Sequence, residues 1–433
     1  MSAEAAAGQG GQAAAGWAKR LARVESRNVT YLAEPPPFWT SASGAEVQDA
    51  AGNRYLDLSG AFGVAFAGHA HPLVVERIRV QAGRLVHAMG DVHPPTVKVE
   101  FLEALSALLP WESSRAILGL SGADAVEAAL KTAQLATGRP GVIAFEGAYH
   151  GLTLGALAAT GREHFRQSFV ERLARHVEFV PFPESKMEAP RALDQVARLL
   201  AGAATVPVGA LLAEPVQGRA GVRIPPPGFL AEVARLARAE GALFVADEVL
   251  TGMGRTGALL GCEHEGVRPD LVCLGKALGG GVPISACVGP AAVMDAWPGS
   301  TGEAIHTSTF LGHPLGCAAG LGFLAALEAE DLIGRARRGG RHALAYLRSE
   351  LDGCDRVLEV RGRGLLIGIE LAADGGSEPA VGVARKALRQ GVIVLPAGVR
   401  GEVVELAPPA TVAASELERG LEEVVAAVRS TVA

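Results

Sequence analysis

A lysine and an aspartate each follow an apolar run in the middle of the chain. Lys276 comes just after the run Leu271–Leu274, and Asp247 ends the run that starts at Ala242. A lysine that is withdrawn from water at the end of a strand has a lowered pKa, which makes its amine nucleophilic. An isolated lysine is more often a solvated surface residue. Taken alone, Lys276 favours the surface interpretation, and other residues must decide between the two.

The segment Ser121-Gly122-Ala123 follows another apolar run and opens a stretch with helical periodicity. Backbone N–H groups in the first turn of a helix bind phosphate, and small residues allow the phosphate to come close. A serine is also a common N-terminal helix cap, here with Asp124 in the first turn. By itself this segment favours an ordinary cap.

These three features together indicate one cofactor. Pyridoxal 5'-phosphate needs an amine to form a Schiff base with its aldehyde, a carboxylate to keep its pyridine nitrogen protonated, and a phosphate site. Lys276 could supply the amine, Asp247 the carboxylate, and Gly122 with its neighbours the phosphate site. Tyr149 could offer an aromatic face to the ring. The combination predicts a pyridoxal phosphate site.

Two glycine-rich stretches offer other readings. The stretch Gly252–Gly257 has the G-x-G-x-x-G spacing of dinucleotide sites and follows a predicted strand, but no sustained helix is visible after it. An NAD-dependent oxidoreductase is therefore a remote alternative. Gly275 and Lys276 lack the earlier glycine and the following serine or threonine of a P-loop, which excludes a nucleoside-triphosphatase site.

The elements that must position these residues can be read from short apolar runs. Strands buried on both faces appear as continuous apolar runs, and helical crossovers connect parallel neighbours. Helix-patterned segments, residues 123–137 and 228–240 among them, lie between several of the runs. We expect a large α/β domain over residues 75–325 with a mostly parallel seven-stranded sheet. The predicted strands are residues 116–118, 142–145, 177–180, 208–212, 242–245, 271–274 and 284–288.

The two ends of the chain have a different pattern. Alternating apolar positions around Gly52-Asn53 predict a hairpin over residues 39–58, and a helix begins near His71-Pro72. After residue 325 we expect long helices over residues 321–351, strands over residues 365–370 and 392–395, and a final helix over residues 414–428. We predict a disordered segment 1–16, an N-terminal part of a small α+β domain over residues 17–74, and the rest of that domain over residues 326–433.

Six blocks of sequence are recognisable in one fixed order. They are SGADAVEAALKTA, FEGAYHGLT, EPVQGRAGVRIPPPGF, ADEVLTGMGRTG, LGKALGGGVPISA and HTSTFLGHPLGCAAGL. From about residue 40 to its end, the chain resembles the class III pyridoxal-phosphate-dependent aminotransferases of fold type I. The resemblance implies transfer of an amino group from an amine or amino acid to a 2-oxo acid. Because the family also contains racemases, an amino-acid racemase or epimerase is the alternative.

The resemblance also implies a role for each matching residue. Lys276 forms the Schiff base and moves protons, while Asp247 pairs with the pyridine nitrogen. Val249 packs under the ring, Tyr149 packs over it, and Glu214 lies beside the substrate. Thr309 reaches the phosphate from a partner subunit, which implies a homodimer with shared active sites. The full set of expected cofactor-binding residues is Ser121, Gly122, Ala123, Tyr149, His150, Glu214, Asp247, Val249, Lys276 and Thr309.

Three departures from the family pattern concern the substrate. Leu250 stands where members usually have a glutamine that touches the cofactor hydroxyl, and Arg219 stands where an acidic residue is usual. Glu405 occupies the position of a carboxylate-binding arginine, so it would repel an acidic substrate and favour an amine, unless it points to solvent. Phe62, Glu214 and Glu405 are the expected substrate-binding residues. The missing cation could come from Arg219, Arg223 or Arg400.

The composition limits the class of protein. The 433 residues are 49% hydrophobic and carry a net charge of −6. The sequence has no dense run of lysine and arginine of the kind that binds nucleic acid. No apolar stretch is long enough to cross a membrane, and the N-terminus lacks a signal-peptide pattern. The five cysteines form neither a CxxC pair nor a cluster with histidines, so we expect no metal site. We expect a cytoplasmic enzyme that acts on small molecules.

Overall fold

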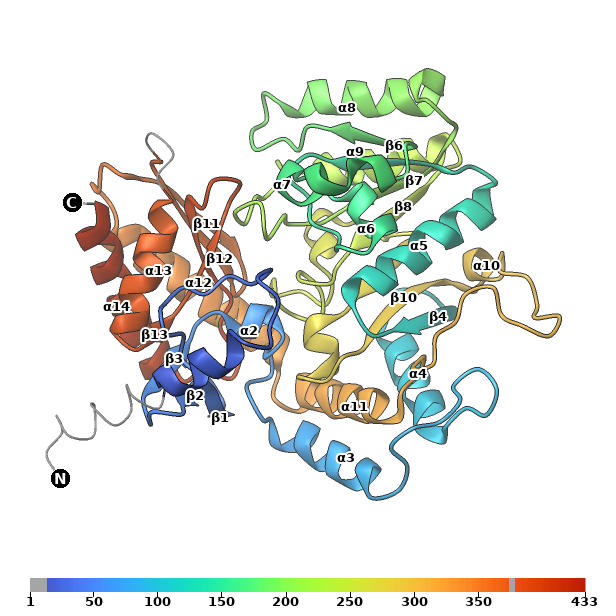
Figure 1. The fold of residues 1–433 in the computed structure, drawn as a ribbon. Coiled ribbons are helices and arrows are strands. Elements are labelled where there is room, and N and C mark those ends of the chain that lie inside the picture. The colour runs from blue at the N-terminus through green and yellow to red at the C-terminus, as the bar shows by residue number, and fades with distance from the viewer. Residues whose placement is uncertain (1–13, 374–377, 433) are drawn as a thin grey trace, which may run out of the picture.

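The computed structural model describes residues 14–373 and 378–432. Of the segment predicted to be disordered, residues 1–13 lie outside this range, and residues 14–16 belong to a helix over residues 14–21. Figure 1 shows a larger lobe built around one sheet and a smaller lobe in which the blue N-terminal strands lie beside the orange and red C-terminal elements. The predicted domain boundaries at residues 75 and 325 stay predictions.

The larger lobe contains a seven-stranded sheet in the order β4-β10-β9-β8-β7-β5-β6. Its strands are β4 (Ser114–Gly119), β5 (Gly141–Phe145), β6 (Val177–Val180), β7 (Val208–Ala213), β8 (Leu243–Asp247), β9 (Leu271–Leu274) and β10 (Ser285–Pro290). Only β10 runs antiparallel to its neighbours in this sheet, so the other six strands point the same way. All seven predicted strands are confirmed.

The continuous apolar runs reflect burial on both faces of this sheet. Along β7, Ala210 and Leu212 pack on the side of helix α5 (Gly122–Thr137). Leu211, between them, belongs to the core on the opposite side, together with residues of helix α9 (Phe229–Ala239). Since successive side chains of a strand point to opposite faces, helices on both sides leave the middle of a central strand such as β7 without a polar residue. The polar side chains next to these central strands, such as Asp247 and Glu214, therefore lie at the strand ends.

The smaller lobe combines both ends of the chain in two four-stranded sheets. One has the order β1-β2-β3-β13 and the other β11-β12-β15-β14. The predicted N-terminal hairpin is confirmed, and its last strand pairs in parallel with β13, more than 300 residues later in the sequence. The strands are β1 (Trp39–Ser43), β2 (Glu46–Asp49), β3 (Arg54–Asp57), β11 (Val357–Arg363), β12 (Leu366–Leu371), β13 (Val392–Ile393), β14 (Leu395–Ala397) and β15 (Val403–Leu406).

The long helices predicted over residues 321–351 are present, and the chain breaks between them near residue 330. Helix α11 (Pro314–Ala329) ends just before Asp331, which has a φ of 47° and caps helix α12 (Leu332–Glu350) by accepting from the Gly334 N–H at 3.1 Å. Asp is a favoured cap because its side chain satisfies a free N–H group of the first turn. The remaining helices are α2 (Gly60–Gly63), α3 (Pro72–Ala82), α4 (Thr96–Leu108), α6 (Leu154–Ala159), α7 (Glu163–Arg166), α8 (Ala189–Arg198), α10 (Ala291–Met294), α13 (Pro379–Arg389) and α14 (Ala414–Val432).

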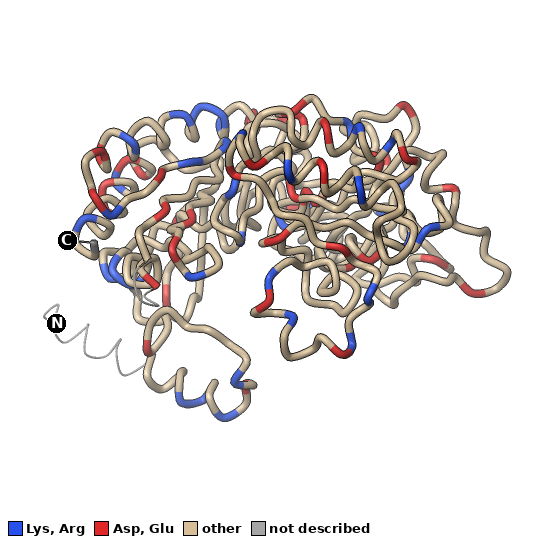
Figure 2. The backbone as a smooth tube through the Cα atoms, turned by 90° about the horizontal axis from the view of Figure 1, so that it is seen from above, with Lys and Arg blue, Asp and Glu red and all other residues tan. Residues whose placement is uncertain are grey.

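Charged residues are dispersed over the molecule. Figure 2 shows basic and acidic positions intermixed along the whole tube. Within residues 14–373 and 378–432, no helix has the length and apolar character that a membrane span requires. The same residues contain no group of three or more metal-ligating side chains.

Candidate active site

A cavity of about 460 Å³ lies at the carboxyl ends of the parallel strands. Asp247 is the last residue of β8, Glu214 follows β7 directly, and Lys276 is the second residue after β9. Ligands of open α/β sheets bind at this edge, because the loops there converge. The cavity is lined by Ser121, Gly122, Ala123, Tyr149, His150, Gly151, Leu152, Thr153, Glu214, Arg219, Asp247, Val249, Leu250 and Lys276. Nine of the predicted cofactor-binding residues therefore meet in one place.

The N-terminus of helix α5 forms one wall of the cavity. Ser121 caps the helix by accepting from the Asp124 N–H at 3.2 Å, and the Asp124 carboxylate accepts in return from the Ser121 N–H at 2.9 Å. Gly122 and Ala123 occupy the first two helical positions, whose N–H groups have no carbonyl partner within a helix. A Cβ on Gly122 would come within 2.8 Å of Val249 Cγ1. Glycine is thus required for the helix start to pack against Val249, which follows the end of β8.

Asp247 is held by a buried histidine. His150 Nδ1 lies 2.7 Å from Asp247 Oδ2, and both side chains are buried. The other carboxylate oxygen accepts from the Val249 N–H at 3.1 Å. These bonds fix the orientation of a carboxylate that faces the cavity. Among the described residues, His150 Nε2 is buried without a hydrogen-bond partner.

Lys276 is half-buried at the cavity. It begins a short 3-10 helix, Lys276–Gly279, with a φ of 43°, which non-glycine residues seldom adopt and which is typical of functional sites. Burial lowers the pKa of its ammonium group, whereas the carboxylates of Asp247, Glu214 and Glu405 raise it. Because burial has the largest effect, the neutral and nucleophilic amine is favoured relative to a solvated lysine.

Glu214 is a second buried carboxylate in the cavity. Its two oxygens accept from the Tyr149 N–H at 2.8 Å and the Gly218 N–H at 3.2 Å. Burial raises the pKa of Glu214 to about 7, His150 opposes this effect, and the charge of Asp247 adds to it. A carboxyl group with such a pKa can hold or release a proton near neutral pH.

These groups fit pyridoxal phosphate. The cavity offers a free helix N-terminus for the phosphate, an oriented carboxylate for the pyridinium nitrogen and an amine of lowered pKa for the aldehyde. Val249 and Tyr149 also line it, and Tyr149 is itself held by an edge contact with Phe165 at 5.4 Å between ring centroids.

Three predicted residues do not line the cavity of the single chain. Phe62 is 64% exposed, and Thr309 is exposed on the segment between α10 and α11. Glu405 lies on β15 and is only 4% exposed, so the alternative in which it points to solvent is wrong. Its charge acts on Lys276, and among the described residues its Oε2 atom has no hydrogen-bond partner.

Several lining residues were missed from the sequence. Gly151, Leu152 and Thr153 directly follow the Tyr-His pair, so adjacency was the available signal. Arg162, whose guanidinium donates to the carbonyl oxygens of Arg219 and Gly398, is the extended residue just before helix α7 and belongs to no recognisable motif. Its place near the cavity follows from tertiary packing alone.

The dinucleotide alternative finds no support in the structure. Residues 249–260 form turns after β8, and only a short 3-10 helix, Gly261–Glu265, follows. A Cβ on Gly252 would meet the Glu248 carbonyl oxygen at 2.7 Å, and one on Gly254 would meet Phe66 at 2.8 Å. These glycines allow close packing within the protein and do not open a helix toward a ligand.

Comparison with known proteins identifies the family. The family model "Aminotransferase class-III" matches residues 30–428. The chain is 40% identical to the acetylornithine aminotransferase of Methanopyrus kandleri, covering 94% of this chain and 98% of the relative. It is 35% identical to the 4-aminobutyrate aminotransferase of Mycobacterium leprae, covering 94% and 93%.

Solved structures give the same result. The ornithine aminotransferase of Toxoplasma gondii, whose crystal structure contains PLP at partial occupancy in the active site, superposes with a TM-score of 0.85 at 30% identity, covering 95% of this chain and 94% of the other. The named relatives are aminotransferases, so a racemase is not favoured. The fold, the cavity and these relatives together show that the chain belongs to the class III aminotransferases, pyridoxal-phosphate-dependent enzymes that transfer amino groups from amines or amino acids to 2-oxo acids.

Proposed function

We propose that aminotransfer takes place in the cavity at the strand ends, with Lys276 as the residue that binds the cofactor aldehyde and carries the proton. The observation that supports this proposal is the convergence of a half-buried lysine, an oriented aspartate and a free helix N-terminus. Pyridoxal phosphate supplies an electron sink for the substrate carbon that loses its proton. The lowered pKa of Lys276 gives an amine that can accept this proton and return it at a neighbouring atom.

The other lining residues hold the cofactor in this proposal. Asp247 keeps a proton on the pyridine nitrogen, and His150 orients the carboxylate from behind. Ser121, Gly122 and Ala123 bind the phosphate through backbone N–H groups. Val249 and Tyr149 enclose the ring from its two faces, and Glu214, with its raised pKa, lies beside the reacting atoms.

Lys276→Ala in the purified holoenzyme tests this proposal. The variant should show no transamination with any pair of amine and 2-oxo acid that the wild type accepts. Lys131→Ala is the matched control, because Lys131 is an exposed residue of helix α5 that lies outside the set lining the cavity. Turnover by the Lys276→Ala protein at the rate of the Lys131→Ala protein would contradict the assignment.

We propose that two residues near Lys276, the apolar Phe62 and the acidic Glu405, contact the amine donor. Phe62 precedes Gly63, and a Cβ on Gly63 would lie 3.8 Å from Lys276 Cδ, so this segment runs close to the reacting nitrogen. Glu405 is buried, and its charge acts on Lys276. A carboxylate in this position repels a second carboxylate and favours a donor amine that carries none nearby.

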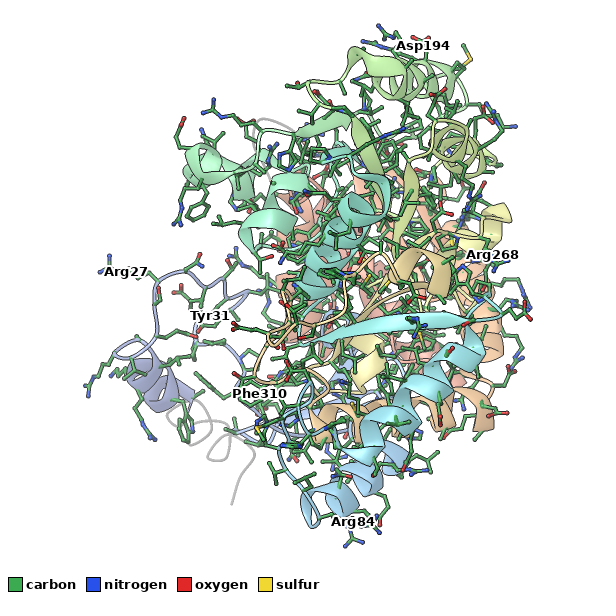
Figure 3. The ribbon with its side chains drawn as sticks, turned by 90° about the vertical axis from the view of Figure 1, so that its right-hand side faces the viewer. Arg27, Tyr31, Arg84, Asp194, Arg268 and Phe310 are labelled. Atoms are coloured by element: carbon green, nitrogen blue, oxygen red, sulfur yellow. The ribbon has the colours of Figure 1, made fainter. Side chains whose placement is uncertain are left out.

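We also propose a homodimer that completes the active site. Residues 85–92 and 305–310 lie side by side, since a Cβ on Gly90 would collide with the Leu311 carbonyl oxygen at 1.9 Å. The paired segments expose several large apolar side chains, which are Leu85, Val86, Met89, Val92, Ile305 and Phe310. Phe310, labelled in Figure 3, is 47% exposed next to Thr309. A second copy covering this surface would bring Thr309 toward the other subunit's phosphate site.

Phe310→Glu tests the dimer. The charge should produce monomers in analytical ultracentrifugation and lower the affinity for pyridoxal phosphate. Leu358→Glu, an exposed apolar position on β11, is the control and should leave the dimer intact. If the Phe310→Glu protein sediments like the wild type with unchanged cofactor affinity, this surface is not the dimer interface.

We propose a cytoplasmic location for the enzyme. The five cysteines are free, and four of them are buried. Free thiols persist in a reducing compartment. Fractionation of cells that produce the protein tests the location, and recovery outside the cytoplasmic fraction would contradict it.

A further inference from the structure

The 2-oxo acid substrate sets a requirement that the proposed function leaves open. Its carboxylate lies next to the carbonyl that reacts, so it enters the cavity as a negative charge. Burial of a charge is costly unless a hydrogen-bonded partner of opposite charge receives it. Among the described residues that line the cavity, Lys276 and Arg219 are the only lysine and the only arginine. Since Lys276 is needed for the chemistry, Arg219 is left for the carboxylate.

Arg219 is firmly placed on the loop between β7 and α9. Its Nη1 donates to the Pro396 carbonyl oxygen at 3.2 Å, and its own carbonyl oxygen accepts from the Gly398 N–H at 3.1 Å. The guanidinium still faces the cavity, and its charge acts on Tyr149, Lys276 and Glu405. A guanidinium has five N–H donors in a planar fork, which leaves donors for a carboxylate after the bond to Pro396.

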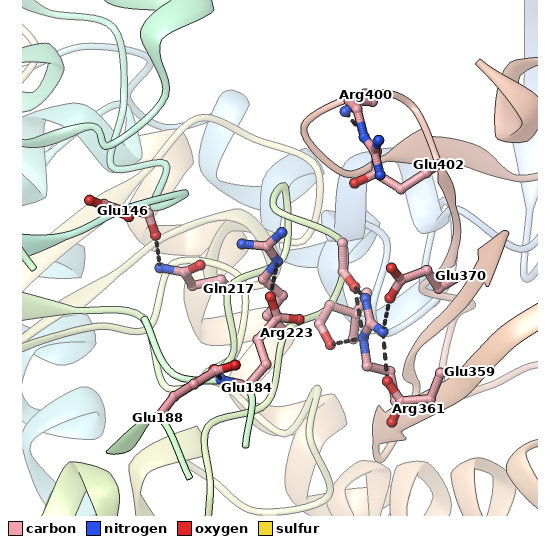
Figure 4. A network of polar contacts seen from close by, with 12 residues as sticks. Glu146, Glu184, Glu188, Gln217, Arg223, Glu359, Arg361, Glu370, Arg400 and Glu402 are labelled. Atoms are coloured by element: carbon pink, nitrogen blue, oxygen red, sulfur yellow. Dashed lines mark hydrogen bonds and ion pairs between the residues drawn. The ribbon is translucent and has the colours of Figure 1, made fainter. Parts of the chain in front are cut away.

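The other two arginines suggested by the sequence are committed elsewhere or distant. Arg223 Nε forms an ion pair with Glu184 Oε1 at 3.2 Å. Arg400 is exposed and lies next to Glu402. Figure 4 shows the Arg223 side chain directed at Glu184 and Arg400 beside Glu402. Neither lines the cavity.

Arg162 supports Arg219 from behind. It is buried, donates through Nη1 to the Arg219 carbonyl oxygen at 3.0 Å and through Nη2 to the Gly398 carbonyl oxygen at 3.0 Å. Burial lowers the pKa of Arg162, and the charge of Arg219 adds to this effect. Two guanidinium groups brought together in this way repel each other, and an anion bound beside them relieves the repulsion. Arg162 is therefore a positioning residue for Arg219.

The remainder of the cavity does not offer a place for a second carboxylate. Leu152 and Leu250 contribute apolar surface to its lining. Glu214 lies in the cavity, and the charge of the buried Glu405 acts on Lys276, which lines it. Both would repel another negative group. Arg361, a further arginine of this region, forms ion pairs with Glu359 and Glu370, as Figure 4 shows. It also donates a hydrogen bond to the Gly221 carbonyl oxygen.

We propose that Arg219 binds the carboxylate of the 2-oxo acid, with Arg162 as its positioning residue, and that the preferred acceptor is a monocarboxylic 2-oxo acid. This inference rests on the proposed function, because it assigns the acceptor to the same cavity.

The test isolates the acceptor half of the reaction. The apoenzyme is loaded with pyridoxamine 5'-phosphate, and its reaction with pyruvate or 2-oxoglutarate is followed in the visible spectrum. Wild-type protein should be half-saturated at a lower concentration of pyruvate than of 2-oxoglutarate. Arg219→Gln should raise the half-saturating pyruvate concentration by about 10- to 100-fold, as expected for loss of a charged hydrogen bond. Arg219→Lys should recover part of this loss.

Two controls separate binding from folding. The affinity of Arg219→Gln for pyridoxamine 5'-phosphate and its limiting rate at high pyruvate should stay near the wild-type values, whereas a merely structural role would change both. Arg400→Gln, an arginine of the same region that is exposed, should shift half-saturation by less than about twofold.

Two results would overturn the inference. One is half-saturation of Arg219→Gln by pyruvate at the wild-type concentration. The other is half-saturation of wild-type protein by 2-oxoglutarate at a concentration equal to or below that of pyruvate. If loaded wild-type protein reacts with no 2-oxo acid at all, the proposed function itself fails, and the two failures are distinguishable.

Discussion

The cofactor side and the substrate side of the cavity are built in different ways. The cofactor side comes from residues that end or follow strands of one sheet: Asp247, Glu214, Lys276 and the start of α5. The substrate side brings together Arg219, the turn around Gly398 and Glu405 of β15, which belong to different lobes. The residues that we propose hold the cofactor thus share one sheet, whereas the positions of those that we propose meet the substrate depend on how the two lobes pack against each other.

This difference has a consequence for specificity. A frame of buried strands fixes geometry, because its interior is closely packed on both faces. Loops at the junction of two lobes can exchange one charged residue for another with little effect on the sheet. We infer that the chemistry common to the family resides in the frame and that the choice of substrate resides at the junction.

The largest effect in this comparison should come from the frame. Asp247→Asn keeps the shape of the side chain and removes the charge that, in our proposal, would keep a proton on the pyridine nitrogen. We expect kcat to fall by about a thousandfold, in the range seen when one charge-stabilising group is removed. Steady-state kinetics with any accepted substrate pair measures this. A fall of less than about tenfold would place Asp247 outside the chemistry.

A smaller fall in kcat is expected when His150, the residue that contacts Asp247, is changed. His150→Gln removes the ring that orients Asp247 through the 2.7 Å contact. Loss of such an outer partner costs about 10- to 100-fold in activity or affinity at comparable sites. The ratio of kcat between His150→Gln and Asp247→Asn measures the order of the two effects. If His150→Gln is the more damaging, the histidine itself takes part in the reaction.

The sequence predicted the frame well for a physical reason. Strands buried on both faces are continuous apolar runs, and the residues that end them, such as Asp247, are then the first polar positions available for function. Five of the six family blocks lie at or just after these strand ends, and the sixth, residues 306–321, leads into helix α11. The resemblance to the family added the roles of Val249 and Glu214.

The residues where the two lobes meet at the cavity, such as Arg219 and Glu405, were harder to predict. Arg219, Arg223 and Arg400 were equivalent candidates in the sequence, because the bonds that distinguish them join segments far apart in the chain. Arg219 lies 177 residues from Pro396, whose carbonyl oxygen it binds. Likewise, the burial of Glu405 follows from the pairing of β15 with β12 and β14 and from the elements packed on that sheet. Local sequence patterns carry no signal for such contacts.

A change at the junction should alter the acceptor and spare the chemistry. Glu405→Gln removes a buried negative charge that acts on Arg219 and Lys276. We expect kcat/KM for 2-oxoglutarate to rise by about tenfold, since a repulsive charge next to a second carboxylate is lost. The value for pyruvate should change by less than about twofold. Equal changes for both acceptors would show that Glu405 does not discriminate between them.

The smallest expected effect concerns pH. The pKa of Lys276 is lowered by burial, and the Glu405 carboxylate raises it. The neutral amine is present above the pKa, so the rate at which apoenzyme binds pyridoxal phosphate covalently should fall as the pH drops through that pKa. In Glu405→Gln the opposing charge is absent, and the midpoint should move to lower pH. Stopped-flow absorbance across a pH series measures the midpoint. A shift toward higher pH would mean that the charge of Glu405 does not reach Lys276.

The most direct measurement of the central claim is the position of the covalent attachment. Holoenzyme is reduced with borohydride, digested and analysed by peptide mass spectrometry. The account predicts that the cofactor mass is fixed to the peptide that contains Lys276, and to no other lysine peptide. Attachment to a different lysine, or no attachment in protein saturated with pyridoxal phosphate, would contradict it.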